Sequence, residues 1–327
     1  MGHPDNMYSL VADIGGTNTR VALADGRQIV DGTIQRYSNV DFAGLETVLR
    51  RYIHDQGGVE PIAACVAVAG PVHDGTATLT NLDWTIDEDT LRRATNAQTV
   101  AILNDLQAQG HALGYIDPDN IRNILPGPDS PPNAARLVVG VGTGFNAAPV
   151  FDLKHGRIVP PSECGHANLP IRNEMELRLC QFVSTAHGFP AVEDVLSGRG
   201  LERAYAFLGQ EAGDPREAAA KDIMAACHDG SDPRAVDAAK LFTRILGTVC
   251  GNLSLIQLPF GGVSLVGGVA RAIAPHLSAF GFGDAFCDKG RFAGFMGNFA
   301  VDVIEDDYAA LTGSAAHLVA LAKAPSS

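Results

Sequence analysis

The sequence predicts an α/β protein built on open sheets. Short apolar runs rich in β-branched residues alternate with stretches that carry apolar residues at helical spacing. A strand, glycine turn, strand pattern occurs at residues 8–24 and again at 136–153, which indicates two related halves. In open α/β sheets the ligand sites lie beyond the carboxyl ends of strands, so we expect binding and catalytic residues where these apolar runs end.

The first half begins with a predicted pair of strands. Tyr8–Asp13 and Thr19–Ala24 are apolar and β-branched, and Gly15-Gly16 marks a tight turn between them. Gln28–Tyr37 is predicted as a third strand. The other elements expected in this half are helices over 42–55, 87–94 and 106–113 and buried strands over 62–69 and 99–103.

The second half follows a proline-rich segment. Residues 117–134 hold five prolines and are either the boundary between the halves or a surface loop within one domain. The pattern then restarts with Arg136–Val141, a Gly142-Thr143-Gly144 turn and Asn146–Leu153. Further expected elements are helices near 173–186, 192–208, 216–228, 234–256 and 308–322 and strands over 263–266 and 299–305.

Composition excludes several classes of partner. The 327 residues include 24 Lys and Arg against 37 Asp and Glu, a net charge of −13, and no basic block offsets this balance locally. Because binding to the nucleic-acid backbone needs clustered cations, we expect no nucleic-acid partner. The chain lacks the run of about 18 apolar residues that a membrane helix needs, so we expect no membrane span. A small anionic substrate remains compatible, because backbone amides can hold phosphate.

Cysteine usage bears on the compartment. The six cysteines have no CxxC spacing, and the first residues lack a basic stretch followed by an apolar run. These features predict free thiols and a cytoplasmic protein.

Common catalytic signatures are absent from the sequence. No Gly-Lys pair occurs, so there is no GxxxxGK[ST] loop, and no GxGxxG opens a helix. HExxH and GxSxG are missing as well. Phosphate chemistry would therefore depend on other glycine turns.

Two glycine turns are candidates for that role. Asp13 ends a strand directly before Gly15, Gly16 and Thr17, where backbone N–H groups can approach phosphate oxygens and the carboxylate can orient a metal ion or its waters. The alternative is an Asp-containing hairpin turn. The Gly142-Thr143-Gly144 turn allows the same two interpretations, but its matching position in the second half favours a nucleotide clamp.

Taken together, these motifs resemble those of a known family. The DxGGTxxR start, the GTG turn and the glycines after Val266 look like the phosphate loops and adenosine segment of sugar kinases that share the actin and heat-shock ATPase fold. Over nearly the whole chain, the sequence resembles the bacterial ATP-dependent glucokinase family. The segments that carry this resemblance are Ala12–Arg20, Leu103–Asp105, Glu163–His166, Val195–Gly198, Phe286–Phe292 and Thr312–Leu318.

The resemblance implies a fold and an activity. It implies a two-domain actin-like ATPase (ribonuclease H-like) fold with a small α/β domain over 1–108, a helix at 307–327 packing back on it, and a large α/β domain over 109–306, with a cleft between them. It also implies a glucokinase that transfers the γ-phosphoryl of ATP to the 6-hydroxyl of D-glucose. ATP with Mg²⁺ and a homodimer are further implications.

Site residues follow from the same resemblance. The sugar would be held by Asn104, Asp105, Glu163, His166 and Glu193, with Asp105 also acting as catalytic base. Asp13 would hold Mg²⁺ through water. The nucleotide would contact Ala12, Asp13, Ile14, Gly15, Gly16, Thr17, Gly142, Thr143, Gly144, Gly267 and Gly268.

Structural interpretations of these residues stay open. Asp105 can serve as the N-cap of the following helix. Glu193 can compensate a helix dipole in a first turn. Glu163–His166 can be a simple loop, and no second Cys/His pair accompanies it to form a zinc site.

Two departures from the family pattern leave the identity of the sugar substrate undecided. Asn146 stands where the family usually has a second glycine after the GTG turn, and Asn168 lies where an acidic residue is common. A kinase for a different hexose or sugar derivative is therefore an alternative. A non-catalytic sugar-sensing protein and an actin-like ATPase that needs no sugar are two others.

Overall fold

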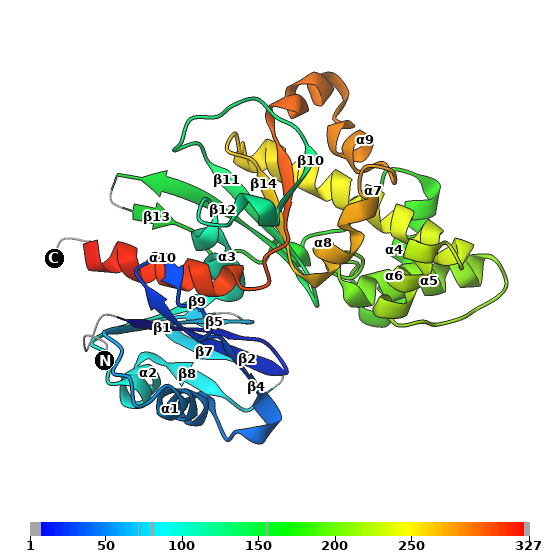
Figure 1. The fold of residues 1–327 in the computed structure, drawn as a ribbon. Coiled ribbons are helices and arrows are strands. Elements are labelled where there is room, and N and C mark those ends of the chain that lie inside the picture. Colours follow the sequence, from blue (N-terminus) through cyan, green and yellow to red (C-terminus); the bar gives the residue numbers. More distant parts are fainter. Residues whose placement is uncertain (1–7, 71, 80–81, 155, 324–327) are drawn as a thin grey trace. The chain divides into compact units, whose positions relative to one another are not determined.

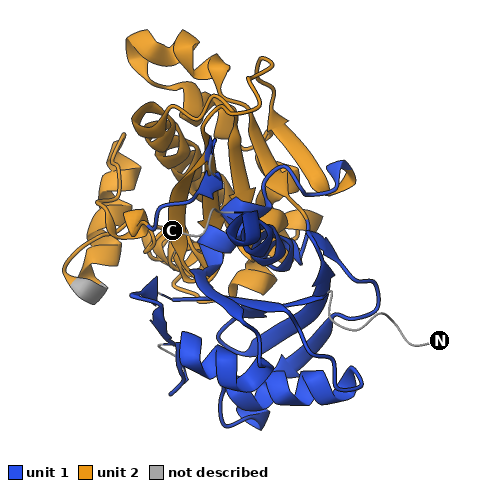
Figure 2. Ribbon diagram, turned by 90° about the vertical axis from the view of Figure 1, so that its left-hand side faces the viewer, with its two compact units in different colours: residues 1–118, 152–161, 306–327 blue, residues 119–151, 162–305 orange. Residues whose placement is uncertain are grey.

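The computed structural model describes residues 8–323 except 71, 80–81 and 155 (Figure 1). The opening Met1-Gly2-His3 and the last four residues of the predicted terminal helix therefore lie outside the described residues. The chain forms two compact units (Figure 2). Unit 1 comprises residues 1–118, 152–161 and 306–327, and unit 2 comprises residues 119–151 and 162–305.

Unit 1 is built on a six-stranded sheet. Its order is β3-β2-β1-β5-β9, and β4 pairs with β2 beside β3. The strands are β1 (Ser9–Ile14), β2 (Asn18–Asp25), β3 (Gln28–Ile29), β4 (Gln35–Ser38), β5 (Ala63–Val68) and β9 (Thr99–Asn104). β1 runs parallel to β5, and β5 to β9, with Ile14 beside Val68 and Val68 beside Asn104. The carboxyl ends of these three strands therefore meet at one edge.

Helices cover both faces of this sheet. α1 (Leu45–Asp55) and α2 (Glu88–Thr95) share one core with it, and α3 (Asp105–Ala112) and α10 (Ala309–Lys323) share the other. A side chain at Gly313 would collide with the carbonyl oxygen of Ala108, so glycine permits α10 to lie close on α3. A small sheet of β6 (Val72–His73), β7 (Thr76–Thr78) and β8 (Thr85–Asp87), absent from the sequence prediction, completes the unit.

Unit 2 contains a second six-stranded sheet of order β10-β15-β14-β11-β12-β13. Its strands are β10 (Ile121–Leu125), β11 (Arg136–Val141), β12 (Phe145–Leu153), β13 (Gly156–Ile158), β14 (Val263–Val266) and β15 (Val301–Ile304); the β12–β13 tip, residues 152–161, is counted with unit 1. β14 is parallel to both β11 and β15. The antiparallel β11 and β12 repeat the arrangement of β1 and β2.

Helices make up most of the rest of unit 2. They are α4 (Glu174–His187), α5 (Gly198–Glu211), α6 (Ala220–Asp229), α7 (Pro233–Gln257), α8 (Gly268–Ile273) and α9 (Phe282–Cys287). The long α7 packs against α5, α6 and α9, and buries Phe242 and Leu246 completely. The 3-10 helices in the described part of both units are Asn39–Asp41, Pro118–Asn120, Cys164–His166, Ala274–His276 and Gly290–Asn298.

Two predicted elements differ most from the structure, and β10, β13, α8 and α9 form where no strand or helix was predicted. The single strand expected over 28–37 is two strands, because residues 30–33 turn, with Gly32 at φ +77° and Thr33 N–H donating to Val30 O at 3.2 Å. The helix expected from residue 192 begins at Gly198. Among the described residues, no helix is long and apolar enough to cross a membrane.

Candidate active site

The first glycine turn, in unit 1, is held by a residue far along the chain. Gly15 N–H donates to Asn18 O at 2.9 Å and closes the turn. The buried Asn39 donates from Nδ2 to Gly15 O at 2.8 Å and from its backbone N–H to Thr17 O at 2.9 Å, and its Oδ1 accepts from the Thr19 hydroxyl at 2.8 Å. No motif in the sequence links Asn39 to the turn that it supports, so this role was not predicted.

Asp13 lies beside this turn and pairs across the strands with Arg20. Arg20 Nη1 lies 3.0 Å from Asp13 Oδ2. Burial raises the pKa of the Asp13 carboxyl, and the Arg20 guanidinium opposes that rise.

The residues around Asp13 fit a magnesium ion held through water. Mg²⁺ is commonly bound by one or two carboxylates, several waters and substrate phosphates. Among the described residues there is no group of three or more His, Cys, Asp or Glu that could hold a metal by itself. A single carboxylate next to a glycine turn that could hold a substrate phosphate is a donor set of this kind.

Asn104 and Asp105 join β9 to α3, at the same sheet edge as the glycine turn. Asn104 is the N-cap of α3: its Oδ1 accepts from Leu106 N–H at 2.9 Å, and its backbone N–H donates to Gln107 Oε1 at 3.1 Å. Its Nδ2 donates to Gly70 O at 2.8 Å. The expectation that Asp105 is the cap is therefore wrong.

Asp105 is instead the first residue of α3. Its Oδ1 accepts from Leu106 N–H at 2.8 Å, which orients the carboxylate. The free N–H groups at the start of a helix carry partial positive charge and stabilise an anion there. The strand end and the helix start thus place the Asp105 carboxyl where a negative charge is stabilised.

The second glycine turn, in unit 2, is bonded to the segment that precedes α5. Gly142 N–H donates to Gly144 O and Gly198 N–H donates to Gly142 O, both at 2.9 Å. Glu193 Oε2 accepts from Phe145 N–H at 2.9 Å. A Cβ at Gly144 would lie 2.5 Å from that same oxygen, so a side chain there would displace the Glu193 carboxylate.

Glu193 does not lie in a helix, and the helix-dipole interpretation is wrong. α5 begins at Gly198 with Ser197 as its N-cap, and the Ser197 hydroxyl donates to Glu193 O at 2.8 Å. Glu193 N–H donates to Gly165 O at 2.9 Å. These two bonds fix the backbone of Glu193, and the bond from Phe145 N–H fixes its carboxylate.

The Glu163–His166 segment is anchored by Asn146. Asn146 Nδ2 donates to Ser162 O, and its Oδ1 accepts from Cys164 N–H at 3.2 Å. Both ends of the Asn146 amide are thus engaged with the chain. Glu163 and His166 are exposed, and His166 and Glu193 line one cavity of about 380 Å³.

Gly267 and Gly268 lie at the neighbouring strand end. β14 pairs with β11, with Val266 beside Gly140, so the two glycine segments follow adjacent parallel strands. Gly267 has φ +104°, and a Cβ there would lie 2.5 Å from Val141 O. Only glycine combines this conformation with so close an approach.

Each unit thus gathers its own set of predicted residues. Unit 1 collects Asp13, the Gly15–Thr17 turn, Asn104 and Asp105 at the carboxyl edge of its sheet, with Ala12 and Ile14 in the adjoining strand. Unit 2 collects the Gly142–Gly144 turn, Glu163, His166, Glu193, Gly267 and Gly268.

Two units, each with a glycine turn between two antiparallel strands of a sheet and helices against it, define the class: this is the actin-like ATPase fold. The sequence matches the Glucokinase family over residues 10–321. The chain therefore belongs to the glucokinase family.

Individual relatives agree with this assignment. A glucokinase of Saccharophagus degradans is 33% identical over 313 residues, which cover 94% of this chain and 97% of the relative. A glucokinase of Brucella abortus is 34% identical over 320 residues, or 97% of this chain and 91% of the relative. The crystal structure of a glucokinase from an Antarctic psychrotroph superimposes with a TM-score of 0.85 at 29% identity, covering 95% of this chain and 98% of that one.

Proposed function

We propose that this protein is an ATP-dependent glucokinase, which transfers the γ-phosphoryl of ATP to the 6-hydroxyl of D-glucose and releases glucose 6-phosphate and ADP. The observation that carries the proposal is Asp105, a carboxylate oriented by Leu106 N–H at the start of α3 in a chain of the glucokinase family. The match covers every residue of both candidate sets.

In this mechanism Asp105 is the general base. It accepts the proton of the 6-hydroxyl while that oxygen attacks the γ-phosphorus in line. The new bond joins the sugar O6 to the phosphorus, and the bond from phosphorus to the β,γ-bridging oxygen breaks with its electrons going to ADP. The bond from Leu106 N–H keeps the carboxylate directed as the proton arrives.

We propose that planar and charged side chains bind the sugar hydroxyls. We assign Asn104, Asp105, Glu163, His166 and Glu193 to the sugar, because a pyranose needs groups that accept and donate several hydrogen bonds at once. Phe145 N–H holds Glu193 Oε2, so we assign Oε1 of that carboxylate to a sugar hydroxyl.

We propose that the backbone of the glycine segments binds the nucleotide. The amides of Gly15, Gly16 and Thr17 and those of Gly142, Thr143 and Gly144 would bind phosphate oxygens, and Gly267 and Gly268 would face the adenosine. When bound through water to Asp13, Mg²⁺ would neutralise charge on the phosphates. Strands β1 and β11 hold the two turns in place.

The proposal requires residues of both units to act on one sugar and one ATP. We propose a small domain over 1–108, joined by the helix of residues 307–327, and a large domain over 109–306. On the family resemblance we also propose a homodimer and a cytoplasmic location.

A coupled assay of ADP release from Mg-ATP, run with a panel of hexoses, tests the proposal. Glucose-dependent release with formation of glucose 6-phosphate is the expected result. Asp105→Ala should lower kcat by about 10²- to 10⁴-fold and leave measurable but weaker glucose binding. Asp89→Ala, which removes an exposed carboxylate from the first turn of α2, is the control and should keep full activity.

Other outcomes would assign another function. Activity with a different sugar alone would move the substrate to another hexose. ADP release without sugar would indicate an ATPase, and sugar binding without ADP release would indicate a sugar-sensing protein. Unchanged turnover in Asp105→Ala would refute the role of that residue.

A further inference from the structure

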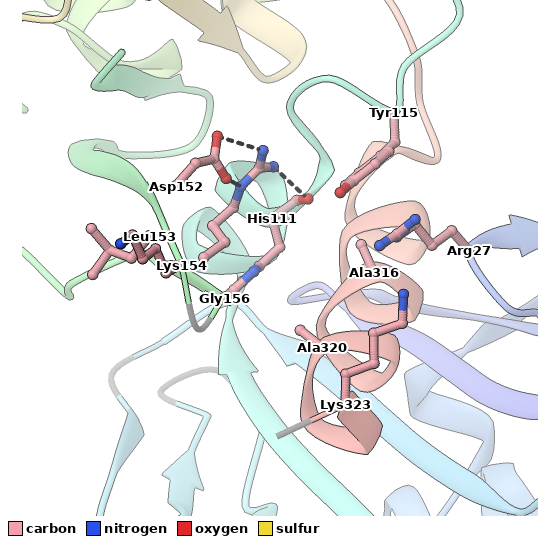
Figure 3. A pocket seen from close by; sticks show the side chains of 11 residues that line it. Arg27, His111, Tyr115, Asp152, Leu153, Lys154, Gly156, Ala316, Ala320 and Lys323 are labelled. Atoms are coloured by element: carbon pink, nitrogen blue, oxygen red, sulfur yellow. Dashed lines mark hydrogen bonds and ion pairs between the residues drawn. The ribbon is translucent and has the colours of Figure 1, made fainter. Parts of the chain in front are cut away.

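Unit 1 holds a cavity that the proposed reaction does not use. It has a volume of about 340 Å³, within the range of small-molecule sites, and Figure 3 shows the side chains around it. We call it the α10 pocket. Its walls come from the β2–β3 turn, the end of α3, the β12–β13 tip and α10, and they include Arg27, Tyr115, Lys154, Arg157, Ala320 and Lys323.

The pocket is lined by an excess of cations. Of its four basic residues, Arg157 is bound by Asp152, with distances of 2.7 and 3.0 Å between the guanidinium and the two carboxylate oxygens. Asp152 is also the one acidic residue in the lining among the residues described. Arg27, Lys154 and Lys323 make no ion pair within the described ranges, although the protein as a whole carries a net charge of −13.

Tyr115 fixes the position of Arg27 without using its donors. The Arg27 guanidinium lies 4.7 Å from the centre of the Tyr115 ring, and that of Arg157 lies 5.5 Å from the same centre. A cation–π contact engages the face of a guanidinium. The N–H groups of Arg27 lie in its plane, so they remain available for the two parallel hydrogen bonds with which arginine binds phosphate.

The α10 side of the pocket combines space and charge. Ala316 and Ala320 lie one turn apart on α10, and Lys323 follows on the same face. Figure 3 shows Arg27 and Lys323 along this side, with Lys154 on the opposite rim. Lys323 suits the negative end of its own helix, but Arg27 lies in a strand turn, so helix dipoles do not account for the pair.

We propose that the α10 pocket binds a phosphate dianion, either inorganic phosphate or the phosphate group of a small phosphorylated metabolite. Arg27 and Lys323 would carry the charge recognition, and the alanines would leave room for the ligand. A ligand there would also adjoin Arg157, which donates to His111 O at 2.9 Å and to Leu113 O at 2.5 Å at the end of α3. α3 is the helix that begins with Asp105.

Calorimetric titration of the full chain tests this site. Inorganic phosphate, methyl phosphate and glucose 6-phosphate would each be titrated into the wild type and into Arg27→Ala, Lys323→Ala and the double variant. The control is Lys221→Ala, which removes an exposed cation of α6 in unit 2. We expect the double variant to weaken phosphate binding at least about tenfold, because it removes two charged donors, and the control to leave it unchanged.

The titrations distinguish free phosphate from a phosphate ester as the ligand, and they distinguish results that support the site from results that refute it. Tighter binding of one of the three probes identifies free phosphate or an ester as the ligand, and loss of that binding in the double variant supports the site. Equal affinity in wild type and double variant, or no binding heat for any of the three, overturns it. Circular dichroism checks that the variants fold, and Arg27→Glu/Lys323→Glu should abolish binding. Since the titration needs no turnover, it remains valid even if the kinase assay is negative.

Discussion

Glu193 and Phe145 are joined by a hydrogen bond from the Phe145 backbone N–H to Glu193 Oε2, with 2.9 Å between the atoms and 48 residues between their positions in the chain. Phe145 directly follows the turn assigned to phosphate, and Glu193 is assigned to the sugar. One bond therefore links the two proposed binding functions inside unit 2. A change in the backbone of the turn would shift the Glu193 carboxylate through this bond.

Gly144→Ala is expected to disturb sugar binding from the phosphate turn. The added Cβ would lie 2.5 Å from Glu193 Oε2, so the carboxylate must move and the Phe145 bond must weaken. We expect the KM for glucose to rise about tenfold or more, since a charged hydrogen bond contributes about 1.5–3 kcal/mol. Steady-state kinetics at saturating ATP would measure it.

Gly142→Ala is the matched control for that substitution. A Cβ at Gly142 meets no atom within 4 Å, so this variant alters the same turn without displacing Glu193. Its KM for glucose should equal that of the wild type. If both alanine variants change the glucose KM equally, the specific link through Glu193 does not exist.

Asn146→Ala is expected to loosen the Glu163–His166 segment. Loss of the amide removes the bonds to Ser162 O and Cys164 N–H that hold this segment. We expect a higher KM for glucose with little change in the KM for ATP, measured by varying each substrate in turn. Asn168→Ala, at an exposed position, is the control and should change neither constant. The opposite pattern would make Asn168, not Asn146, the residue that tunes sugar binding.

Arg20→Met is expected to shift the acidic limb of the pH profile. Burial raises the pKa of Asp13 and Arg20 counteracts it, so without Arg20 the carboxyl takes up its proton at higher pH. If ionised Asp13 holds the magnesium waters, the acidic limb of kcat/KM for ATP moves to higher pH in this variant. Arg36→Met is the control, because Arg36 pairs with Arg20 across β2 and β4 but does not contact Asp13. Coincident profiles for Arg20→Met and wild type would refute this role of Asp13.

The neighbouring side chains of His111, which is buried, and His317, which is half-buried, are expected to make unit 1 sensitive to acid. Burial lowers the pKa of His111 from near 6.5 to about 3, with smaller contributions from His317 and Arg157, and burial also lowers the pKa of His317. Below pH 6.5 the unfolded chain therefore binds protons that the folded chain does not. Through His111 the free energy of unfolding falls as the pH drops from 6.5 toward 3, by up to about 1.4 kcal/mol per pH unit, and His317 contributes in the same direction below pH 6.5.

Urea unfolding at a series of pH values would measure this slope. His111→Gln/His317→Gln should flatten it between pH 6.5 and 3 relative to the wild type. His54→Gln, at an exposed site on α1, should leave the slope unchanged. Parallel curves for the wild type and the double variant would contradict the assignment.

Local patterns predicted the parts of this structure that depend on local sequence. The buried strands β5 and β9 and the long helix α7 follow from apolar periodicity, and the glycine turns follow from conformational need. Residues 191–197 have helical composition, but backbone bonds from Val192 to Ala167 and from Glu193 to Gly165 hold them outside the helix. Tertiary contacts of this kind leave no periodic signal.

The supporting residues of the site were the least predictable. Asn39 and Asn146 act on turns through side-chain amides, and asparagine occurs in many loops without such a role. The N-cap at Asn104 in place of Asp105 is a shift of one residue that only the geometry of α3 decides. Asp105 and the glycine turns themselves were predicted as site residues because several motifs agreed along one chain.

The position of α10 in the sequence bears on how the protein is made. β1, β2, β5 and β9 leave the ribosome early, but the face of their sheet that includes Val11, Cys65 and Leu103 packs against residues of α10, near the end of the chain. Until synthesis reaches residues 309–323, α3 is the only helix of that core to have been translated, while every strand of the unit 2 sheet has already been made. The synthesis of unit 1 therefore starts before that of unit 2 and ends after it. A nascent chain stalled before residue 309 exposes apolar surface of the unit 1 sheet, which a chaperone could shield.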